Sequence, residues 1–399
     1  MYSSAPPNGV AIPEAGTQAH VAERRGVALI TALFAIVVLA IIISGVFFTS
    51  QQEYRGTRNS LVEQRAFAIS EFGLNSEISN WDRARNLPGS GFTVGSIDNN
   101  QVYVAEGDTA WVSVTRLSDN GFWVVSEGKA HMGQVKLESR RQTSAYVRIA
   151  YPSITPKGAI TAAGNVTLQG AATVDGDNTD PTGWAQCASI PGSTVPAVTV
   201  PPASTVTYNS NNITSTPAVQ LDPAAGDSNT YVRYGTESWV SLTSNADIKL
   251  PGGNYGQDIL PTGTVTTCNT SLPLNWGEPF RPGSVIGCYN YFPIIYVDGD
   301  IHVNGNGRGQ GILLVNGDLE INGTFEFFGI VIVRNDITKG NGTAKIHGAV
   351  FAANIDLGAS TSWFTGTKDV NYSKCAVESA LQGSAILVRS KERSWVQIF

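Results

Sequence analysis

The chain has 399 residues, a length that predicts two or three domains. Charged residues make up 15% of the sequence, and the formal net charge is −6. Because the chain is acidic and has no block rich in lysine and arginine, it is not expected to bind nucleic acid. The 42 glycines favour β structure with many turns.

The first long hydrophobic segment, Val27 to Ser50, contains no charged residue. A helix of this length can cross a hydrocarbon layer of about 30 Å. The segment is longer than the apolar core of a secretion signal, and no small-residue cleavage site follows it, so we expect the mature protein to retain it. Arg24 and Arg25 precede the segment, which predicts a cytoplasmic N-terminus.

The helical pattern continues beyond the hydrophobic segment. Residues 51–81 contain no proline, and Phe67, Leu74 and Ile78 fall on one face of a helix. The glycines after Pro88 mark the end of this pattern. The sequence therefore predicts one helix over residues 27–81, with one half in the membrane and the other half amphipathic against a globular domain.

Gly26 follows basic residues and precedes the uncharged helical run, and the stretch QRAFAISEFGLN extends from Gln64 to Asn75. In these features the N-terminal region resembles that of PilX-type minor pilins of type IV pilus systems. The resemblance covers about residues 22–150. In that family a prepilin peptidase cuts after the glycine, and the helix packs with other pilins into a filament. The resemblance therefore implies a cytoplasmic leader over residues 1–26, cleavage between Gly26 and Val27, and methylation.

One position departs from the pattern of major pilins. Those proteins carry a glutamate as the fifth residue of the mature chain, and Thr31 stands at that position here. PilX-type subunits and the K-type pseudopilin of type II secretion also tend to lack the glutamate, so the departure favours a minor subunit. An uncleaved signal anchor is the alternative to a processed pilin.

Residues 101–150 alternate as half-buried strands do, so a small antiparallel sheet is expected over residues 90–150. Ala110 to Leu117 and Phe122 to Ser126 flank the Asn120-Gly121 pair, which is a strong hairpin signal. A long helix on an antiparallel meander is an α+β unit, and it is also the pilin architecture.

A short repeat dominates the last third of the chain. VDGDIHVNG begins at Val297, VNGDLEING at Val315 and VRNDITKGN at Val333. Short apolar strands separated by Gly, Asn and Asp corners predict a β-solenoid of about 18 residues per coil over residues 293–375. A similar unit predicts its first strands at residues 151–178. Because end coils need covering, residues 376–399 are expected to form a C-terminal cap.

Between these segments, residues 179–292 hold most of the prolines and are expected to form an irregular insertion. Export would place the cysteines in an oxidising compartment and favour two disulfides, with free thiols as the alternative. Our preferred pairing joins Cys268 to Cys288, which are close in sequence, and Cys187 to Cys375.

Several polar motifs invite a chemical interpretation. Asp298, Asp300 and His302 alternate on one expected strand. Asp318 and Glu320 stand one repeat further, so the group could bind calcium or act in acid/base catalysis. Turn chemistry explains such aspartates better, because they can bond their own backbone at a corner. We therefore expect no metal site.

Two further motifs are also assigned to turns. GNGRGQG from Gly305 to Gly311 lacks the Gly-Lys-Ser/Thr ending of a phosphate-binding loop. DGDNTD from Asp175 to Asp180 lacks the spacing of a calcium loop. No histidine pairs with a nucleophile, so we expect no catalytic residues and no cofactor.

Together these features predict a minor pilin-like subunit of a type IV pilus or related filament, displaying a β-solenoid for pilus initiation, adhesion or surface sensing. Its expected partners are other pilins, a prepilin peptidase, the inner membrane and an unidentified surface or carbohydrate ligand. It would start as a single-pass inner-membrane protein and end in a pilus or outside the cell. The alternatives are a K-type pseudopilin capping a type II secretion pseudopilus, a membrane-anchored bactofilin-like scaffold, and a carbohydrate-active enzyme.

Overall fold

The computed structural model describes residues 25–87, 94–95, 97–103, 108–132, 137–235, 237–338, 340–356, 367–389 and 395–398. Most of the expected leader, residues 1–24, lies outside the described residues. The chain divides into two compact units, the first ending at Val62 and the second beginning at Glu63.

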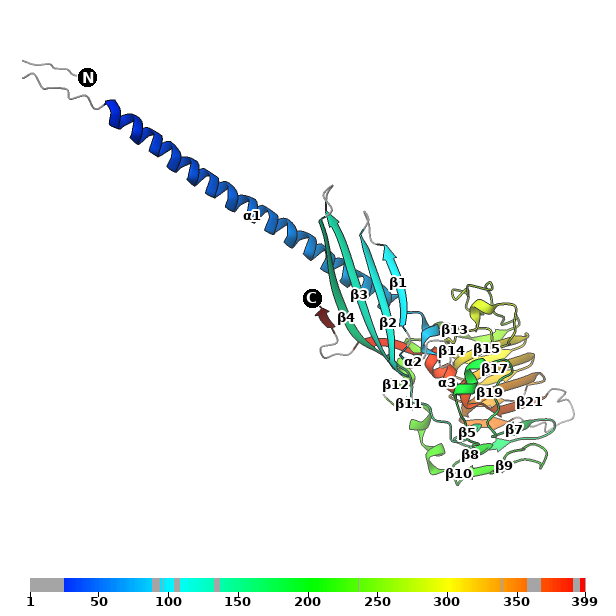
Figure 1. Ribbon diagram of the computed structural model, residues 1–399. Helices are drawn as coiled ribbons and strands as arrows, with labels where there is room; N and C mark the ends of the chain where they lie inside the picture. The colour runs from blue at the N-terminus through cyan, green and yellow to red at the C-terminus, as the bar shows by residue number, and fades with distance from the viewer. Residues whose placement is uncertain are drawn as a thin grey trace, which may run out of the picture. The chain divides into compact units, whose positions relative to one another are not determined.

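One long helix, α1 (Arg25–Ser79), opens the described chain (Figure 1). Its C-terminal part packs on an antiparallel sheet in the second unit, where Ala66 and Leu74 are buried. The helix comes very close to the sheet at Gly73. A Cβ atom there would lie 2.5 Å from Ser126 Oγ and 2.6 Å from Ala110 Cβ, so only glycine fits without displacing the sheet.

The antiparallel sheet has the strand order β1-β2-β3-β4-β22, with β23 also paired to β4. Its strands are β1 (Ile97–Tyr103), β2 (Thr109–Ser118), β3 (Gly121–Met132), β4 (Leu137–Ala150), β22 (Ile386–Arg389) and β23 (Trp395–Ile398). As the Asn-Gly pair predicts, β2 and β3 form a hairpin that closes with Ser118 opposite Gly121. The face toward α1 is apolar and includes Val112, Phe122 and Val147.

The expectation of a C-terminal cap over residues 376–399 is wrong for the two last strands. β22 and β23 join the antiparallel sheet, where Ile386 pairs with Ala150 and Trp395 pairs with Ala145. The physical reason is that β3 pairs with only one edge of β4. The backbone groups on the other edge of β4 need hydrogen-bond partners, and the returning chain supplies them. The part of the expected cap that lies in α3 (Lys374–Gly383) does pack on the parallel sheet. The parallel sheet is thus inserted between two neighbouring strands of the antiparallel sheet.

The second sheet has 15 strands, is parallel throughout, and curls (Figure 1). One row contains β14 (Ile294–Val303), β15 (Gly307–Val315), β17 (Thr324–Val333) and β19 (Thr343–Ala352). Another row contains β16 (Leu319–Ile321), β18 (Asp336–Thr338) and β20 (Asn354–Asp356), which continue from the end of β14. Ile294 pairs with Ile312, and Ile312 pairs with Ile330, so neighbouring strands keep the offset of the sequence repeat.

The chain enters this sheet in the middle. The strands β5 (Ile160–Ala162), β6 (Val166–Thr167) and β7 (Thr173–Asp175) pair with β19, β20 and β21 (Lys368–Tyr372), respectively. The first strands of the sheet and its last strands are therefore neighbours in space although they lie far apart in the sequence.

The segment 179–292 is not the wholly irregular insertion that its prolines suggest. The strands β8 (Val198–Val200), β9 (Val206–Thr207) and β10 (Val219–Leu221) extend the sheet beyond β5 and β6. At the opposite edge β13 (Ile248–Tyr255) pairs with β14. Proline is tolerated here because Pro201 lies just after a strand and Pro251 lies on an edge strand.

The remaining elements are short. They are η1 (Arg83–Asn86), η2 (Ala185–Ser189), η3 (Pro223–Gly226), η4 (Ser228–Tyr231), η5 (Ile286–Cys288), α2 (Trp239–Ser244), and the paired strands β11 (Arg233–Tyr234) and β12 (Glu237–Ser238).

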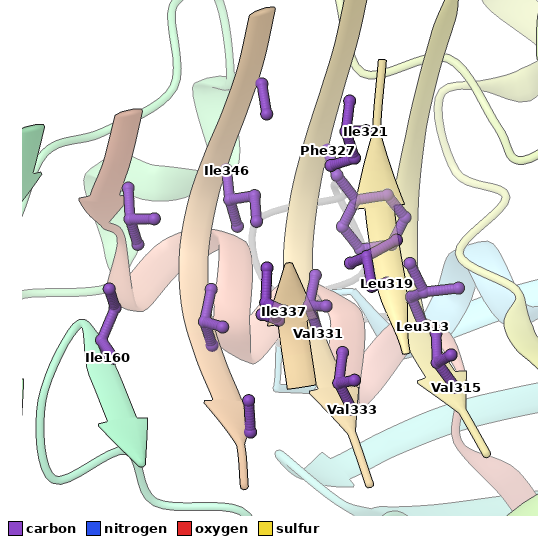
Figure 2. Close-up of a cluster of buried hydrophobic side chains, with 14 of the residues drawn as sticks. Ile160, Leu313, Val315, Leu319, Ile321, Phe327, Val331, Val333, Ile337 and Ile346 are labelled. Atoms are coloured by element: carbon purple, nitrogen blue, oxygen red, sulfur yellow. The ribbon is translucent and has the colours of Figure 1, made fainter. Parts of the chain in front are cut away.

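The C-terminal halves of β15, β17 and β19 are buried on both faces, which explains their continuous apolar runs. Leu313 and Val331 point into the interior with Ile337 from the second row (Figure 2). Their sequence neighbours Ile312 and Ile330 point the other way, into a cluster that includes residues of α3. An alternating apolar and polar pattern would suit only a sheet with one solvated face.

A ladder of side-chain hydrogen bonds follows one corner of the parallel sheet. Asp300 Oδ1 accepts from the backbone N–H of Asp318 at 2.8 Å, and Asp318 Oδ1 accepts from the backbone N–H of Asp336 at 3.1 Å. The series continues as Asp336 accepts from the Asn354 amide, and Asn354 accepts from the backbone N–H of Asn165. Each repeat thereby satisfies a corner donor of the next one.

A lysine lies inside the parallel sheet. Lys368 is 3% exposed, and its Nζ donates to the carbonyls of Ile321 and Gly342 beside a cavity of about 30 Å³. Burial lowers the pKa of Lys368 to about 8, although the nearby Glu320 acts in the opposite direction. The interior therefore holds a cation that costs free energy while it is charged.

Removing a rung of the corner ladder is expected to destabilise the fold. Asp318→Ala leaves the Asp336 N–H without its acceptor and should lower the free energy of unfolding by about 1–2 kcal/mol. Asp318→Asn keeps an acceptor oxygen and should stay within about 0.5 kcal/mol of the wild type. Urea denaturation measures both, with Asp177→Ala as an exposed control. Equal losses of unfolding free energy in Asp318→Ala and Asp318→Asn would show that the charge of Asp318, and not its hydrogen bond, stabilises the fold.

Stability is also expected to rise with pH above about 8. The unfolded chain keeps its Lys368 proton up to the ordinary lysine pKa, whereas the folded chain releases it from about pH 8. The unfolded state then binds more protons, so each unit of pH increase raises the free energy of unfolding by up to about 1.4 kcal/mol. Urea denaturation at pH 7.5 and 9.5 should show this gain in wild type and in the control Lys345→Met. A gain that persists in Lys368→Met would refute the assignment.

Candidate functional site: the exposed apolar half of helix α1

The N-terminal half of α1 presents a long apolar surface. Every side chain from Ala28 to Thr57 is exposed, and large residues such as Leu29, Phe34 and Ile41 are about two-thirds exposed or more. No charged residue interrupts Val27 to Ser50, which rises about 36 Å as a helix. An uncovered apolar surface of this size marks a site for lipid or for another protein.

By length and composition, α1 could cross a membrane over part of Ala28–Ser79, and within the described ranges it is the one helix that passes this test. Its uncharged stretch is as long as a hydrocarbon layer requires. Its polar continuation from Gln51 begins before the folded second unit.

The residues implicated in processing and assembly lie at the start of this helix. Gly26 and Val27 belong to its first turn, and Arg24 lies outside the described residues. Thr31 is exposed, and its hydroxyl donates to the Ala28 carbonyl at 3.0 Å. This bond inside the helix lets a threonine enter an apolar environment without an unsatisfied donor.

The four cysteines form two disulfides. Cys187 is bonded to Cys375, which joins η2 to the start of α3 across 188 positions. Cys268 is bonded to Cys288 and closes a short loop. The first disulfide encloses most strands of the parallel sheet in one covalent loop, so reduction is expected to lower its stability.

The aspartates of the repeat act as corner residues. Asp300 and Asp318 accept backbone N–H groups, while His302 Nδ1 lies 2.9 Å from Glu320 Oε2. Among the residues that the structure describes, no group of three or more His, Cys, Asp or Glu side chains is arranged to hold a metal ion. The Asp175 carboxylate accepts the N–H of Asp177, which is turn chemistry.

The glycine-rich segment Gly305–Gly311 leads into a strand. Its residues from Gly307 onward form β15, and Arg308 is paired with the buried Glu278 at 2.7 Å. The only side-chain charge of this segment is therefore committed to an ion pair.

A polar cleft of about 730 Å³ escapes sequence analysis. It lies between the segment Trp81–Ala84 and the loop closed by Cys268 and Cys288. Arg83 is ion-paired at 2.9 Å with Asp247, which lies beside it in the same wall, and 164 positions separate them. No local motif signals such a site, because its walls meet only through the tertiary fold.

Comparisons with known proteins add little to this geometry. No protein-family model matches the chain, and no curated protein matches it. One similar solved structure is the competence-associated pilin ComZ from Thermus thermophilus, with 12% sequence identity and a TM-score of 0.23. The match covers 85% of this chain and 97% of that one. A TM-score this low is below that of chains with a common fold, so no conclusion is drawn from the likeness.

A charge at the centre of the apolar half should weaken membrane association. Leu39→Lys places a cation at a depth where it costs about 3 kcal/mol, so the membrane-bound fraction should fall by about a hundredfold relative to the soluble fraction. Leu39→Ile is the matched control and should behave as wild type. Recovery in membranes after alkaline extraction gives the readout, and full retention of Leu39→Lys would contradict a membrane-spanning role.

Proposed function

We propose that this chain is a minor pilin-like subunit of a type IV pilus or related filament. The observation that carries the proposal is α1 itself. One continuous helix has an uncharged, exposed half before Gln51 and a half that packs on an antiparallel sheet after Glu63. This arrangement suits a subunit that is stored in a membrane and then packs its apolar half against other subunits. Assembly, not catalysis, is its task.

The finer fold proposal is a pilin-like unit of the PilX type that carries a β-solenoid of about 18 residues per coil. The offset of 18 residues between paired strands, found in both rows, supports it. So does the corner ladder, which recurs with the same offset. The solenoid would be displayed outward for pilus initiation, adhesion or surface sensing.

Before assembly the chain would be a single-pass inner-membrane protein with a cytoplasmic N-terminus. A prepilin peptidase would cut between Gly26 and Val27, and methylation would follow. The boundary between the arginines, Gly26 and the uncharged helix supports this order of events.

The subunit would occupy the tip of the filament in few copies. Thr31 carries no charge, so it cannot neutralise the N-terminal amine of a neighbour, and an unpaired ammonium among packed apolar helices is costly. Residues 80–399 follow the helix, which is far more than the roughly 100–150 of a typical domain. A head of this size is easier to place where no neighbour lies above it. A K-type pseudopilin at the tip of a secretion pseudopilus satisfies the same constraints.

The edge strands of the parallel sheet favour one second candidate, a membrane-anchored scaffold that polymerises through them. β10 ends the sheet on one side, and its Leu221 is 58% exposed. An uncovered strand edge is a template for pairing with another chain. Filaments formed by the purified protein without other subunits would support this candidate.

Gold labelling of an epitope on the parallel sheet tests the position in the filament. Sheared filaments from cells that make the full chain should carry label at one end. Label along the whole length would show a shaft subunit instead. Label that stays with the cell membrane, with none on filaments, would exclude the pilin-like role.

A further inference from the structure

The cleft between Trp81–Ala84 and the Cys268–Cys288 loop is built like a ligand site. Its volume of about 730 Å³ is within the range of pockets that bind small molecules. All of its walls belong to the second unit, so its chemistry is independent of assembly into a filament.

One wall is fixed by an ion pair that also holds the backbone. Arg83 Nη1 lies 2.9 Å from the Asp247 carboxylate, and Asp247 Oδ2 accepts the N–H of Ile294 at 2.9 Å. Asp82 caps η1 by accepting from the N–H of Ala84. The groups of this wall are therefore positioned before any ligand arrives.

The opposite wall is braced from inside. The disulfide joins both sides of the loop, and the buried amide of Asn275 donates to the carbonyls of Thr262 and Asn269. Despite this bracing, Val265 is 60% exposed and Ile286 is 45% exposed at the cleft. Because the loop is already rigid, it loses little conformational entropy when a ligand covers these exposed apolar side chains.

Three polar side chains of the cleft are available to a ligand. Among the described residues, no hydrogen bond within the chain involves the side chains of Thr270, Asn290 and Tyr291. Burial, with a smaller effect of Asp247, raises the pKa of Tyr291 to about 12, so its hydroxyl stays neutral and can donate. Together with Asp82 they offer donors and acceptors at several points around the cleft.

This set of groups discriminates among ligand classes. An anion is disfavoured because Asp82 is near and the one arginine is bound to Asp247. A cation is disfavoured because Asp247 is neutralised by that arginine, and because the Asp82 carboxylate already accepts the N–H of Ala84 at the start of η1. A neutral ligand that carries many hydroxyl groups and apolar C–H faces can use the uncommitted polar groups and cover Val265 and Ile286 at once. We infer that the cleft binds a neutral oligosaccharide of two or three sugar units.

The test uses the full chain in detergent micelles and an array of neutral and acidic oligosaccharides that includes maltotriose, cellotriose and chitotriose. Neutral sugars should bind, and calorimetry then gives the affinity for the strongest of them. Tyr291→Phe and Asn290→Ala should each weaken binding about tenfold, because each removes about one hydrogen bond. Thr270→Trp should weaken binding by placing an indole ring in the cleft.

The matched control is Tyr208→Phe, which removes a hydroxyl from an exposed tyrosine next to β9 and should bind as wild type does. An unchanged melting temperature shows that each variant is folded. Three results would overturn the inference: no binding to any neutral sugar, binding only to acidic sugars, or binding that the three cleft variants leave unchanged. None of them bears on the filament proposal, which the gold labelling tests separately.

Discussion

The parallel sheet depends on one constraint, which is that each repeat must bring the chain back into the same strand register. Asp300 must meet the backbone N–H of Asp318, and Asp318 that of Asp336, at an offset of 18 residues. The same offset stacks Ile294, Ile312 and Ile330. A slip by a single position would reverse the faces of every strand and break the ladder together with the core. The offset from β17 to β19 is longer by a single position, so one insertion between them is accommodated without loss of register.

The connection between the two sheets follows from where the chain leaves and returns. It leaves the antiparallel sheet at Ala150 and returns at Ile386, and these two residues pair with each other. The large parallel sheet is therefore attached through two adjacent chain segments, and Asn86 adds a hydrogen bond to the carbonyl of Ala385. In a subunit that carries a head on a helix, this double attachment would spread a pulling force over two strands instead of one linker.

The sequence predicts the features that local pattern determines. An uncharged run and a helical period define α1, an Asn-Gly pair defines the β2–β3 hairpin, and the repeat defines the strands from Ile294 to Asp356. Nothing local shows that Ile386–Arg389 belongs to the first sheet, because its partner strand β4 lies far earlier in the chain. The strands β8 and β10 are very short and stand among prolines, so their periodicity cannot be detected. The cleft at Arg83 and Asp247 is hidden for the same reason as β22, since tertiary contacts alone assemble it.

The proposed role as a whole depends on two events at α1. A peptidase must cut the chain at the start of this helix, and the apolar half of the helix must then pack against other subunits in a filament. The most direct measurement is the mass and sequence of the N-terminus of the mature protein, isolated from cells with and without an active prepilin peptidase. The proposed role predicts a chain that begins at Val27, carries a methyl group on its amine, and appears only when the peptidase is active. A chain that begins at Met1 in both strains, or one cut beyond Ser50, would contradict it.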